Sequence, residues 1–227
     1  MERWHALGNV YLLTTAELTE EDVRALVGDA DGIVQVVASG PDWADVVVWN
    51  PDGSTAEMSG NATRIAARWL ADSSGATNVS VRVGEREVRA RILDGAEIEQ
   101  DLGPVEVAEP EEIEGLRVTR VWVGNPHAVV IADPADIVLI GPLLETHPRF
   151  PERTNVQVVR IDADGGVTAR VWERGVGETS ASGTSAVAVA AATHGDGRVI
   201  VRFPGGDLHV DLEAGRATVT GPAERVE

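Results

Sequence analysis

Two serine residues each precede a helix-like segment of small and apolar residues, and each could bind or act on an anionic group. Ser59 stands before Gly60–Leu70, and Ser182 stands before Gly183–Thr193. The first backbone N–H groups of a helix lack intrahelical acceptors, and the helix dipole favours negative charge there. A glycine directly after each serine also lets a ligand approach the backbone closely. Serine is a preferred N-cap as well, so capping is the alternative role for both residues.

Short polar clusters interrupt the apolar runs elsewhere along the chain. Taken singly, each is typical of a turn. Taken together, they could line a site for a small zwitterion, in which amides fix the orientation, Arg174 binds a carboxylate, and Glu173 binds an ammonium or relays a proton. The other members of these clusters are Asn9, Asn50, Asn125, His127 and Asn155.

The composition excludes several classes of enzyme. All 19 basic residues are arginine, so the lysine that pyridoxal-phosphate enzymes use for a Schiff base is missing. The absence of cysteine excludes disulfides, cysteine-ligated zinc, iron–sulfur clusters and thiolate catalysis. The five histidines are too scattered to predict a metal site. We therefore expect chemistry without a metal or other cofactor.

The charge and hydropathy point to a protein that acts on a small molecule. A net charge of −18 repels nucleic-acid phosphates, so no nucleic-acid partner is expected. No apolar run is long enough to span a bilayer, and Met1–Gly8 lacks a signal-peptide pattern. We expect no membrane partner and a cytoplasmic location.

The elements that must position these residues are mostly short strands. The Val- and Ile-rich runs bounded by Gly, Asp or Asn predict strands. Helices are expected at Thr19–Val27, Gly60–Leu70 and Gly183–Thr193, and the last of these is apolar all round, which is typical of a buried helix. The predicted strands are Gly32–Ala38, Trp43–Trp49, Val79–Val83, Val88–Ile92, Arg117–Val123, Ala128–Ala132, Asn155–Ile161, Val167–Trp172, Val199–Phe203 and Leu208–Leu212.

The surroundings of the two serines form a weak internal repeat. Met58-Ser59-Gly60-Asn61 resembles Ala181-Ser182-Gly183-Thr184, and the acidic stretch Glu106–Glu114 lies between them. This pattern predicts an α+β chain of two similar halves, residues 1–112 and 113–227, with a C-terminal tail that can return to the first half. Each half would place one buried helix inside a set of strands.

The motifs taken together resemble those of the diaminopimelate epimerase family, in the same order along the chain. The resemblance covers about residues 6–192. It rests on Gly8-Asn9, Asn50-Pro51-Asp52-Gly53-Ser54, Glu57-Met58-Ser59-Gly60-Asn61, Gly124-Asn125-Pro126-His127, Phe150-Pro151-Glu152-Arg153-Thr154-Asn155-Val156 and Glu173-Arg174-Gly175-Val176-Gly177-Glu178-Thr179, followed by Ser182-Gly183-Thr184.

That resemblance implies a fold and a reaction. The fold has two pseudo-symmetric domains, each a barrel-like β-sheet wrapped around a central helix, with the site in the cleft between them. The reaction interconverts LL- and meso-diaminopimelate without a cofactor, as one thiolate removes the α-proton and a thiol on the opposite face returns one. A homodimer is a further expectation from the family.

The resemblance also assigns roles to residues. Ser59 and Ser182 occupy the two thiol positions, and His127 and Glu173 would tune this acid/base pair. Gly183 and Thr184 would donate backbone N–H groups to the α-carboxylate. The residues expected to bind substrate are Asn9, Asn50, Gly60, Asn61, Asn125, Asn155, Glu173 and Arg174.

The departures from the family pattern bear on activity. A thiol has a pKa of about 8.5, which a helix N-terminus lowers, whereas a serine hydroxyl is a far weaker acid. The Ser/Ser form should therefore bind substrate but epimerise it poorly. Val10 replaces a usual acidic residue, Ala62 and Ser185 replace glycines, and Gly32 lies where a further substrate contact is common.

Three explanations of the serines remain open: an engineered Cys→Ser pair, a natural member with serines, and a relative with a different reaction. Three functions therefore remain as well. The first is an amino-acid epimerase. The second is a related cofactor-free isomerase or dehydratase that uses Glu173 or His127 as its base. The third is an amino-acid binding homologue without catalysis.

Overall fold

The computed structural model describes residues 1–56 and 58–226, and it divides into two compact units. The first comprises Met1–Asp101 and Thr220–Glu227, and the second comprises Leu102–Val219. The chain passes into the second unit within β8 (Glu97–Pro104) and returns within β18 (Arg216–Pro222). The acidic stretch that we expected at the division lies in the second unit, where β9 (Glu106–Val107) pairs with β11 (Leu116–Trp122).

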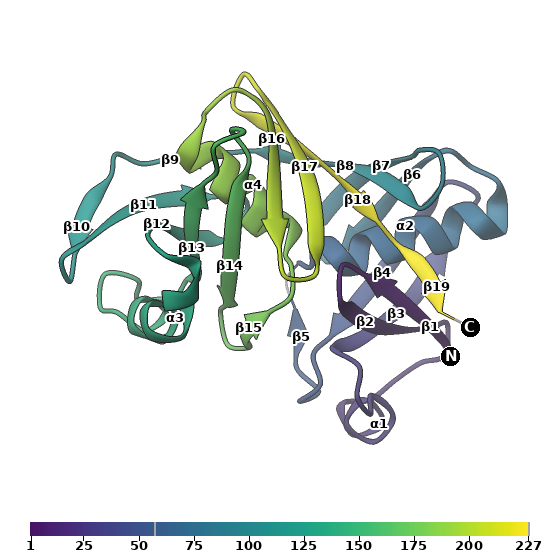
Figure 1. Cartoon of the computed structure of the whole chain (residues 1–227). Coiled ribbons are helices and arrows are strands. Elements are labelled where there is room, and N and C mark those ends of the chain that lie inside the picture. The colour runs from purple at the N-terminus through teal and green to yellow at the C-terminus, as the bar shows by residue number, and fades with distance from the viewer. Residues whose placement is uncertain (57, 227) are drawn as a thin grey trace. The chain divides into compact units, whose positions relative to one another are not determined.

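The first unit is a mixed sheet wrapped around helix α2 (Gly60–Ser74) (Figure 1). The helix contacts β1, β2, β3, β4, β6 and β7, while the short helix α1 (Glu20–Leu26) packs through the buried Val23. The strands are β1 (Glu2–Ala6), β2 (Asn9–Thr14), β3 (Gly32–Ser39), β4 (Trp43–Trp49), β5 (Thr55–Ala56), β6 (Asn78–Val83), β7 (Arg86–Ile92), part of β8, and β19 (Glu224–Val226).

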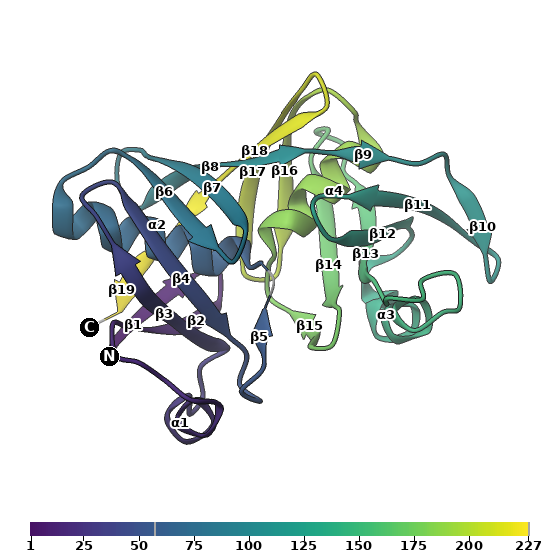
Figure 2. The same ribbon diagram turned by 180° about the vertical axis from the view of Figure 1, so that it is seen from behind.

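The second unit wraps its strands around α4 (Gly183–Thr193) in the same manner (Figure 2). It also contains α3 (Ile137–Glu145), which follows the 3₁₀ turn η1 (Pro134–Asp136). Its strands are β9, β10 (Glu111–Ile113), β11, β12 (Pro126–Ile131), β13 (Asn155–Ile161), β14 (Val167–Glu173), β15 (Gly177–Thr179), β16 (Gly197–Phe203), β17 (Gly206–Glu213) and part of β18.

The two units share one order of strand pairings. In the first, β1–β2 is antiparallel, β2–β3 parallel, β3–β4 and β4–β5 antiparallel, β4–β6 parallel, and β6–β7 antiparallel. In the second, β11–β12 is antiparallel, β12–β13 parallel, β13–β14 and β14–β15 antiparallel, β14–β16 parallel, and β16–β17 antiparallel. The weak sequence repeat therefore corresponds to a repeated topology, and the predicted α+β fold of two barrel-like units is confirmed.

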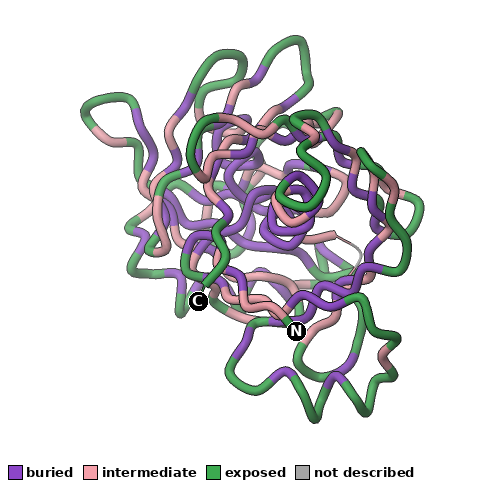
Figure 3. Tube along the Cα trace, turned by 90° about the vertical axis from the view of Figure 1, so that its right-hand side faces the viewer, coloured by how far each residue is buried: buried purple, intermediate pink, exposed green. Residues whose placement is uncertain are grey.

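The two central helices have different boundary signals. Helix α2 begins after its N-cap Ser59 and ends at Gly75, whose φ of 78° is the left-handed conformation that favours glycine at a helix end. It runs beyond the predicted end at Leu70. Most of its residues from Gly60 to Ala71 are buried. Figure 3 colours the buried positions of the chain purple. Helix α4 is buried from Gly183 to Ala191, as its uniformly apolar sequence predicts.

Helix α3 is the element that the sequence patterns did not indicate. It contains Gly141 and Pro142, which both disfavour a helix interior. A Cβ built on Gly141 would lie 2.7 Å from Cγ of Trp172, so the glycine lets the helix approach β14 closely. Packing against the sheet therefore outweighs the poor helix propensity of these two residues.

Candidate active site

Ser59 lies at the start of α2 and uses its hydroxyl in two hydrogen bonds. Oγ accepts from the backbone N–H of Ala62 over 3.2 Å, as an N-cap does. The same oxygen lies 3.2 Å from the phenol oxygen of Tyr11 on β2. Capping and a functional role are therefore compatible at this serine, because the cap bond uses only one lone pair of the oxygen.

Arg64 is a fully buried cation one turn further along α2. Its Nη2 donates to Oδ1 of Asn61, while Nε and Nη1 have no hydrogen-bond partner among the described atoms. Burial lowers the pKa of the guanidinium to about 10, and the nearby Glu97 and Tyr11 oppose that shift electrostatically. Arg64 therefore remains positively charged at neutral pH and fixes the side chain of Asn61.

The other predicted residues of the first unit lie at strand ends. Asn9 begins β2 and is 6% exposed. Asn50 follows β4, where its Nδ2 donates to Oγ of Ser54 over 3.0 Å and its backbone N–H donates to the carbonyl of Ser54. Gly60 and Asn61 occupy the first two positions of α2 and are buried. The sequence thus placed all four in the unit that contains Ser59.

Ser182 begins α4 but, among the described residues, makes no side-chain cap bond. Its side chain is almost buried, with the residue 7% exposed, and its carbonyl accepts from the N–H of Ala186 over 2.9 Å. Gly183 and Thr184 hold the first two positions of the helix, where backbone N–H groups have no intrahelical acceptor. The Ser182 hydroxyl is therefore not committed to capping, in contrast to that of Ser59.

His127 is buried at the start of β12, and its hydrogen bonds fix its protonation. Nδ1 lies 3.0 Å from the amide nitrogen of Gln157, and Nε2 lies 2.8 Å from Oδ1 of Asn125. An amide nitrogen only donates and an amide oxygen only accepts, so the ring proton must lie on Nε2. Burial lowers the pKa of His127 to about 3, and the charge of Arg174 adds to that shift.

A neutral His127 is suited to orienting Asn125 rather than to moving protons. A group whose conjugate acid has a pKa of about 3 is a weak base near neutral pH. Gln157 also donates to Oγ of Ser185, at the third position of α4, over 3.0 Å. A buried chain of side chains therefore links Asn125 to the start of the helix that begins after Ser182.

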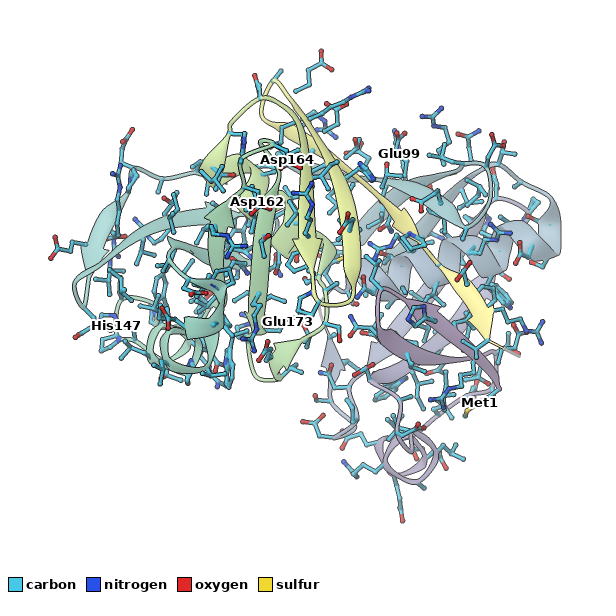
Figure 4. All side chains as sticks on the ribbon, in the orientation of Figure 1. Met1, Glu99, His147, Asp162, Asp164 and Glu173 are labelled. Carbon is cyan, nitrogen blue, oxygen red and sulfur yellow. The ribbon has the colours of Figure 1, made fainter. Side chains whose placement is uncertain are left out.

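Asn155, Glu173 and Arg174 come together at one end of β13 and β14. Nδ2 of Asn155 donates to the carbonyl of Pro126 over 2.9 Å, and Oδ1 accepts from the backbone N–H of Arg174 over 3.0 Å. Oε1 of Glu173 accepts from the hydroxyl of Thr179 over 2.5 Å. Figure 4 shows Glu173 at the end of β14, beside β15.

Glu145, at the end of α3, organises this region and was not predicted from the sequence. The residue is 5% exposed, and its Oε1 accepts from the backbone N–H of Gly175 over 2.7 Å and pairs with Arg153 at 2.6 Å. Oε2 accepts from the indole N–H of Trp172 over 2.8 Å. The turn that bears Glu173 and Arg174 is thus held by a buried carboxylate from a helix that the sequence patterns did not indicate.

A cavity of about 400 Å³ in the second unit lies away from most of these groups. It is lined by Pro126 and His127 but not by Ser182, Glu173 or Arg174, so we do not assign it to the substrate. Its other lining residues are Glu106, Val107, Ala108, Arg120, Val121, Trp122, Arg149, Phe150, Pro151, Glu152 and Arg153.

No cluster of three or more His, Asp or Glu residues in the described part of the chain has the geometry to hold a metal ion. Among the same residues, no helix is both long enough and apolar enough to cross a membrane.

Comparisons with known proteins identify a family. The profile of a family described as diaminopimelate epimerase matches residues 119–226. A diaminopimelate epimerase of Pelotomaculum thermopropionicum is 35% identical, with 98% of this chain and 95% of the relative covered. One of Desulforudis audaxviator is 38% identical, with 99% and 96% covered.

Solved structures share the fold at low sequence identity. A predicted epimerase from Pseudomonas aeruginosa superposes with a TM-score of 0.78 at 14% identity, with 100% of this chain and 96% of that one covered. A probable proline racemase from Agrobacterium radiobacter gives a TM-score of 0.73 at 18% identity, with 99% and 90% covered. These likenesses show the fold alone.

Proposed function

Because the chain belongs to the diaminopimelate epimerase family, we propose that it is an isomerase that interconverts LL- and meso-diaminopimelate without a cofactor. The reaction would serve lysine and peptidoglycan precursor synthesis in the cytoplasm. The observation that supports the proposal is the matching position of Ser59 and Ser182, each directly before the central helix of a unit with the same topology. A homodimer stays a prediction, which light scattering of the purified protein would test.

In the proposed reaction, Ser59 and Ser182 occupy the two proton-transfer positions. One removes the α-proton of the substrate, and the other returns a proton to the opposite face. Negative charge then develops on the α-carboxylate, where the N–H groups of Gly183 and Thr184 at the positive end of α4 can stabilise it. The dipole and the free N–H groups supply this stabilisation without a metal or cofactor.

The polar groups near these helix starts fit recognition of a zwitterion. Arg174 would bind a carboxylate and Glu173 an ammonium, and the turn that bears them is held by Glu145 and Asn155. The remaining binding groups in the proposal are Asn9, Asn50, Gly60, Asn61, Asn125 and Asn155. His127 would act through Asn125 as a neutral hydrogen-bond donor.

Serine chemistry makes the proposed enzyme a slow one. General acid–base catalysis is most efficient when the pKa of the group lies near the working pH, and a serine hydroxyl lies far above it. We therefore propose substrate binding of ordinary strength with turnover well below that of thiol-containing relatives.

The test is proton NMR of LL-diaminopimelate incubated with the protein in heavy water. Loss of the α-proton signal with formation of the meso isomer supports the epimerase. Line broadening without exchange would show a binding site that lacks catalysis. Arg170→Ala should behave as the wild-type protein in this assay, since Arg170 lies on β14 and pairs with Glu178 rather than with a proposed site residue.

A second candidate is a related isomerase or dehydratase, favoured by the absence of any thiol. Glu173 would then be its base, because the buried neutral His127 is a poor one. A panel of α-amino acids and cyclic amino acids, followed by the same exchange assay, separates the two. Exchange of a substrate other than diaminopimelate, lost in Glu173→Gln, would favour the second candidate.

A further inference from the structure

The hydrogen bond between Tyr11 and Ser59 gives this serine a partner that itself can carry a proton. The two side-chain oxygens are 3.2 Å apart, and either can donate. Tyr11 is the one tyrosine in the sequence and comes two residues after Asn9. A phenol has an ordinary pKa of about 10, which is much closer to neutrality than that of a serine hydroxyl.

Gly32 fixes where the Tyr11 ring lies. The two residues are directly paired between the parallel strands β2 and β3. A Cβ built on Gly32 would lie 2.8 Å from Cε1 of Tyr11 and 2.5 Å from the carbonyl oxygen of Trp49. Such distances do not occur for real Cβ atoms, so the ring occupies space that only glycine leaves open. The half-buried phenol is therefore held beside Ser59 by packing.

The buried charge of Arg64 acts on the same phenol. Arg64 and Tyr11 interact electrostatically: a phenolate at Tyr11 would stabilise the charged guanidinium, and the guanidinium would equally stabilise the phenolate. Glu97 also interacts electrostatically with Arg64 and so compensates part of its positive charge. Two nitrogens of Arg64 lack a hydrogen-bond partner among the described atoms, so its charge is only partly compensated there. A positive charge in a low-dielectric interior favours the ionised form of a neighbouring acid.

We propose that Tyr11 is the proton acceptor and donor behind Ser59, so that the first unit performs its half of the reaction with a phenol in place of a thiol. This inference rests on the proposed epimerase function and names the group that makes Ser59 competent in it.

The proposed step balances without any further reactant. The Cα–H bond of the substrate breaks, and its proton moves to Oγ of Ser59. The original hydroxyl proton of Ser59 moves to the phenolate oxygen of Tyr11, while the electron pair left on Cα delocalises into the α-carboxylate. In the reverse direction, Tyr11 returns its proton through Ser59 to Cα. The cap bond from Ala62 still leaves the serine oxygen a lone pair for the incoming proton.

The first test is direct titration of Tyr11. Protein labelled with carbon-13 at tyrosine Cζ gives a single tyrosine resonance, whose shift against pH reports ionisation of this phenol. We expect the midpoint to lie below the ordinary value of about 10, to rise in Arg64→Met, and to fall in Glu97→Gln. A wild-type midpoint at or above the ordinary value overturns the inference, whether or not Arg64→Met folds.

The second test is a double-mutant comparison of α-proton exchange. Tyr11→Phe keeps the ring and its packing but removes the hydroxyl, so it should lower exchange by about 100-fold when residue 59 is serine. In the Ser59→Cys background, Tyr11→Phe should lower the exchange rate far less, because a thiol ionises without a neighbouring base. An equal loss in both backgrounds would mean a structural role, and no loss in either would mean no role; both overturn the inference.

The two proposals fail in different ways. If the wild-type protein exchanges no α-proton of any substrate, the epimerase proposal fails. The phenol of Tyr11 can then still ionise below its ordinary pKa. If exchange occurs but Tyr11→Phe leaves its rate and pH profile unchanged, only the role of Tyr11 is overturned.

Discussion

The amide of Gln157 donates to Nδ1 of His127 over 3.0 Å, and this contact places the ring proton on Nε2, while burial keeps the imidazole neutral. A second proton on the ring would point an N–H at the donating amide. The buried His127 therefore stays neutral and donates a hydrogen bond from its Nε2–H to Oδ1 of Asn125. A residue that looks like a proton-transfer group in the sequence is thus a fixed hydrogen-bond donor in the structure.

The stability of the protein should depend on pH through His127. Its pKa is about 3 in the folded protein and about 6.5 in an unfolded chain, so the unfolded state binds the extra proton first as the pH falls. The free energy of unfolding should decrease from about pH 6.5 downwards, by about 3 kcal/mol between pH 7 and pH 4 from this group alone. Urea unfolding of wild type and His127→Gln across that range measures the difference. If the free energy of unfolding changed with pH in the same way for both proteins, the expectation would be wrong.

The two serines should differ in their contribution to stability. Ser59→Ala removes a formed cap bond and should lower the free energy of unfolding by about 1 kcal/mol. Ser182→Ala removes no cap bond among the described residues and should cost less than about 0.5 kcal/mol. Chemical denaturation followed by tryptophan fluorescence compares the two. An equal decrease in the free energy of unfolding for the two variants would show that Ser182 also caps its helix in solution.

Replacing both serines by cysteine should raise epimerase turnover. Ser59→Cys with Ser182→Cys supplies groups that ionise near neutral pH, and general acid–base catalysis of this kind is worth about 100-fold or more. The rate of α-proton exchange in heavy water measures the gain, with each single replacement as control. Unchanged turnover with retained binding would mean that the pocket itself has diverged from that of the relatives.

Arg174 should be required for substrate binding. Removal of a charge-assisted contact to a carboxylate costs about 2–3 kcal/mol, or roughly 100-fold in affinity. Calorimetric titration of diaminopimelate into Arg174→Ala measures this, and Arg170→Ala on the neighbouring surface of β14 serves as control. Equal affinities in the two variants would mean that Arg174 does not bind the substrate.

Glu145 should stabilise the turn after β14. Glu145→Gln places an amide nitrogen among the donors Gly175 N–H, Trp172 indole N–H and Arg153. A buried donor that faces donors costs about 1–3 kcal/mol, so the melting temperature should fall by several degrees. Glu178→Gln breaks a more exposed ion pair with Arg170 and should cost less than about 1 kcal/mol. Similar decreases in melting temperature for the two variants would show that the buried contacts of Glu145 contribute little to stability.

The repeated topology follows from signals within short stretches of sequence. Each predicted strand and both central helices are present, because alternation of Val with polar residues and an apolar helix face are local patterns. Helix α3 was not predicted, since Gly141 and Pro142 oppose a helix and only the packing of Gly141 against Trp172 explains it. The return of the chain to the first unit depends on the pairing of β19 with β1, which joins residues at opposite ends of the sequence.

The sequence predicts which residues belong to the candidate site, but not the hydrogen bonds that connect them. Runs such as Glu173-Arg174 and Gly183-Thr184 indicate binding groups by the chemistry of their side chains and backbone N–H groups. The Tyr11–Ser59 bond and the Gln157–His127 bond join residues that are far apart in the sequence and lie on different elements. Tyr11 had one sequence signal, as a lone tyrosine close to Asn9, but nothing local distinguishes a phenol in the core from one beside a serine.

The space that Gly32 leaves for the Tyr11 ring makes these two positions a coupled pair in inheritance. A descendant that acquires any side chain at residue 32 must both give up the large ring at residue 11 and shift the strand that carries the Trp49 carbonyl. Tyrosine at residue 11 should therefore occur among close relatives only together with glycine at residue 32. A lineage with cysteine at residue 59 no longer needs the phenol of residue 11, but the Trp49 carbonyl still requires glycine at residue 32.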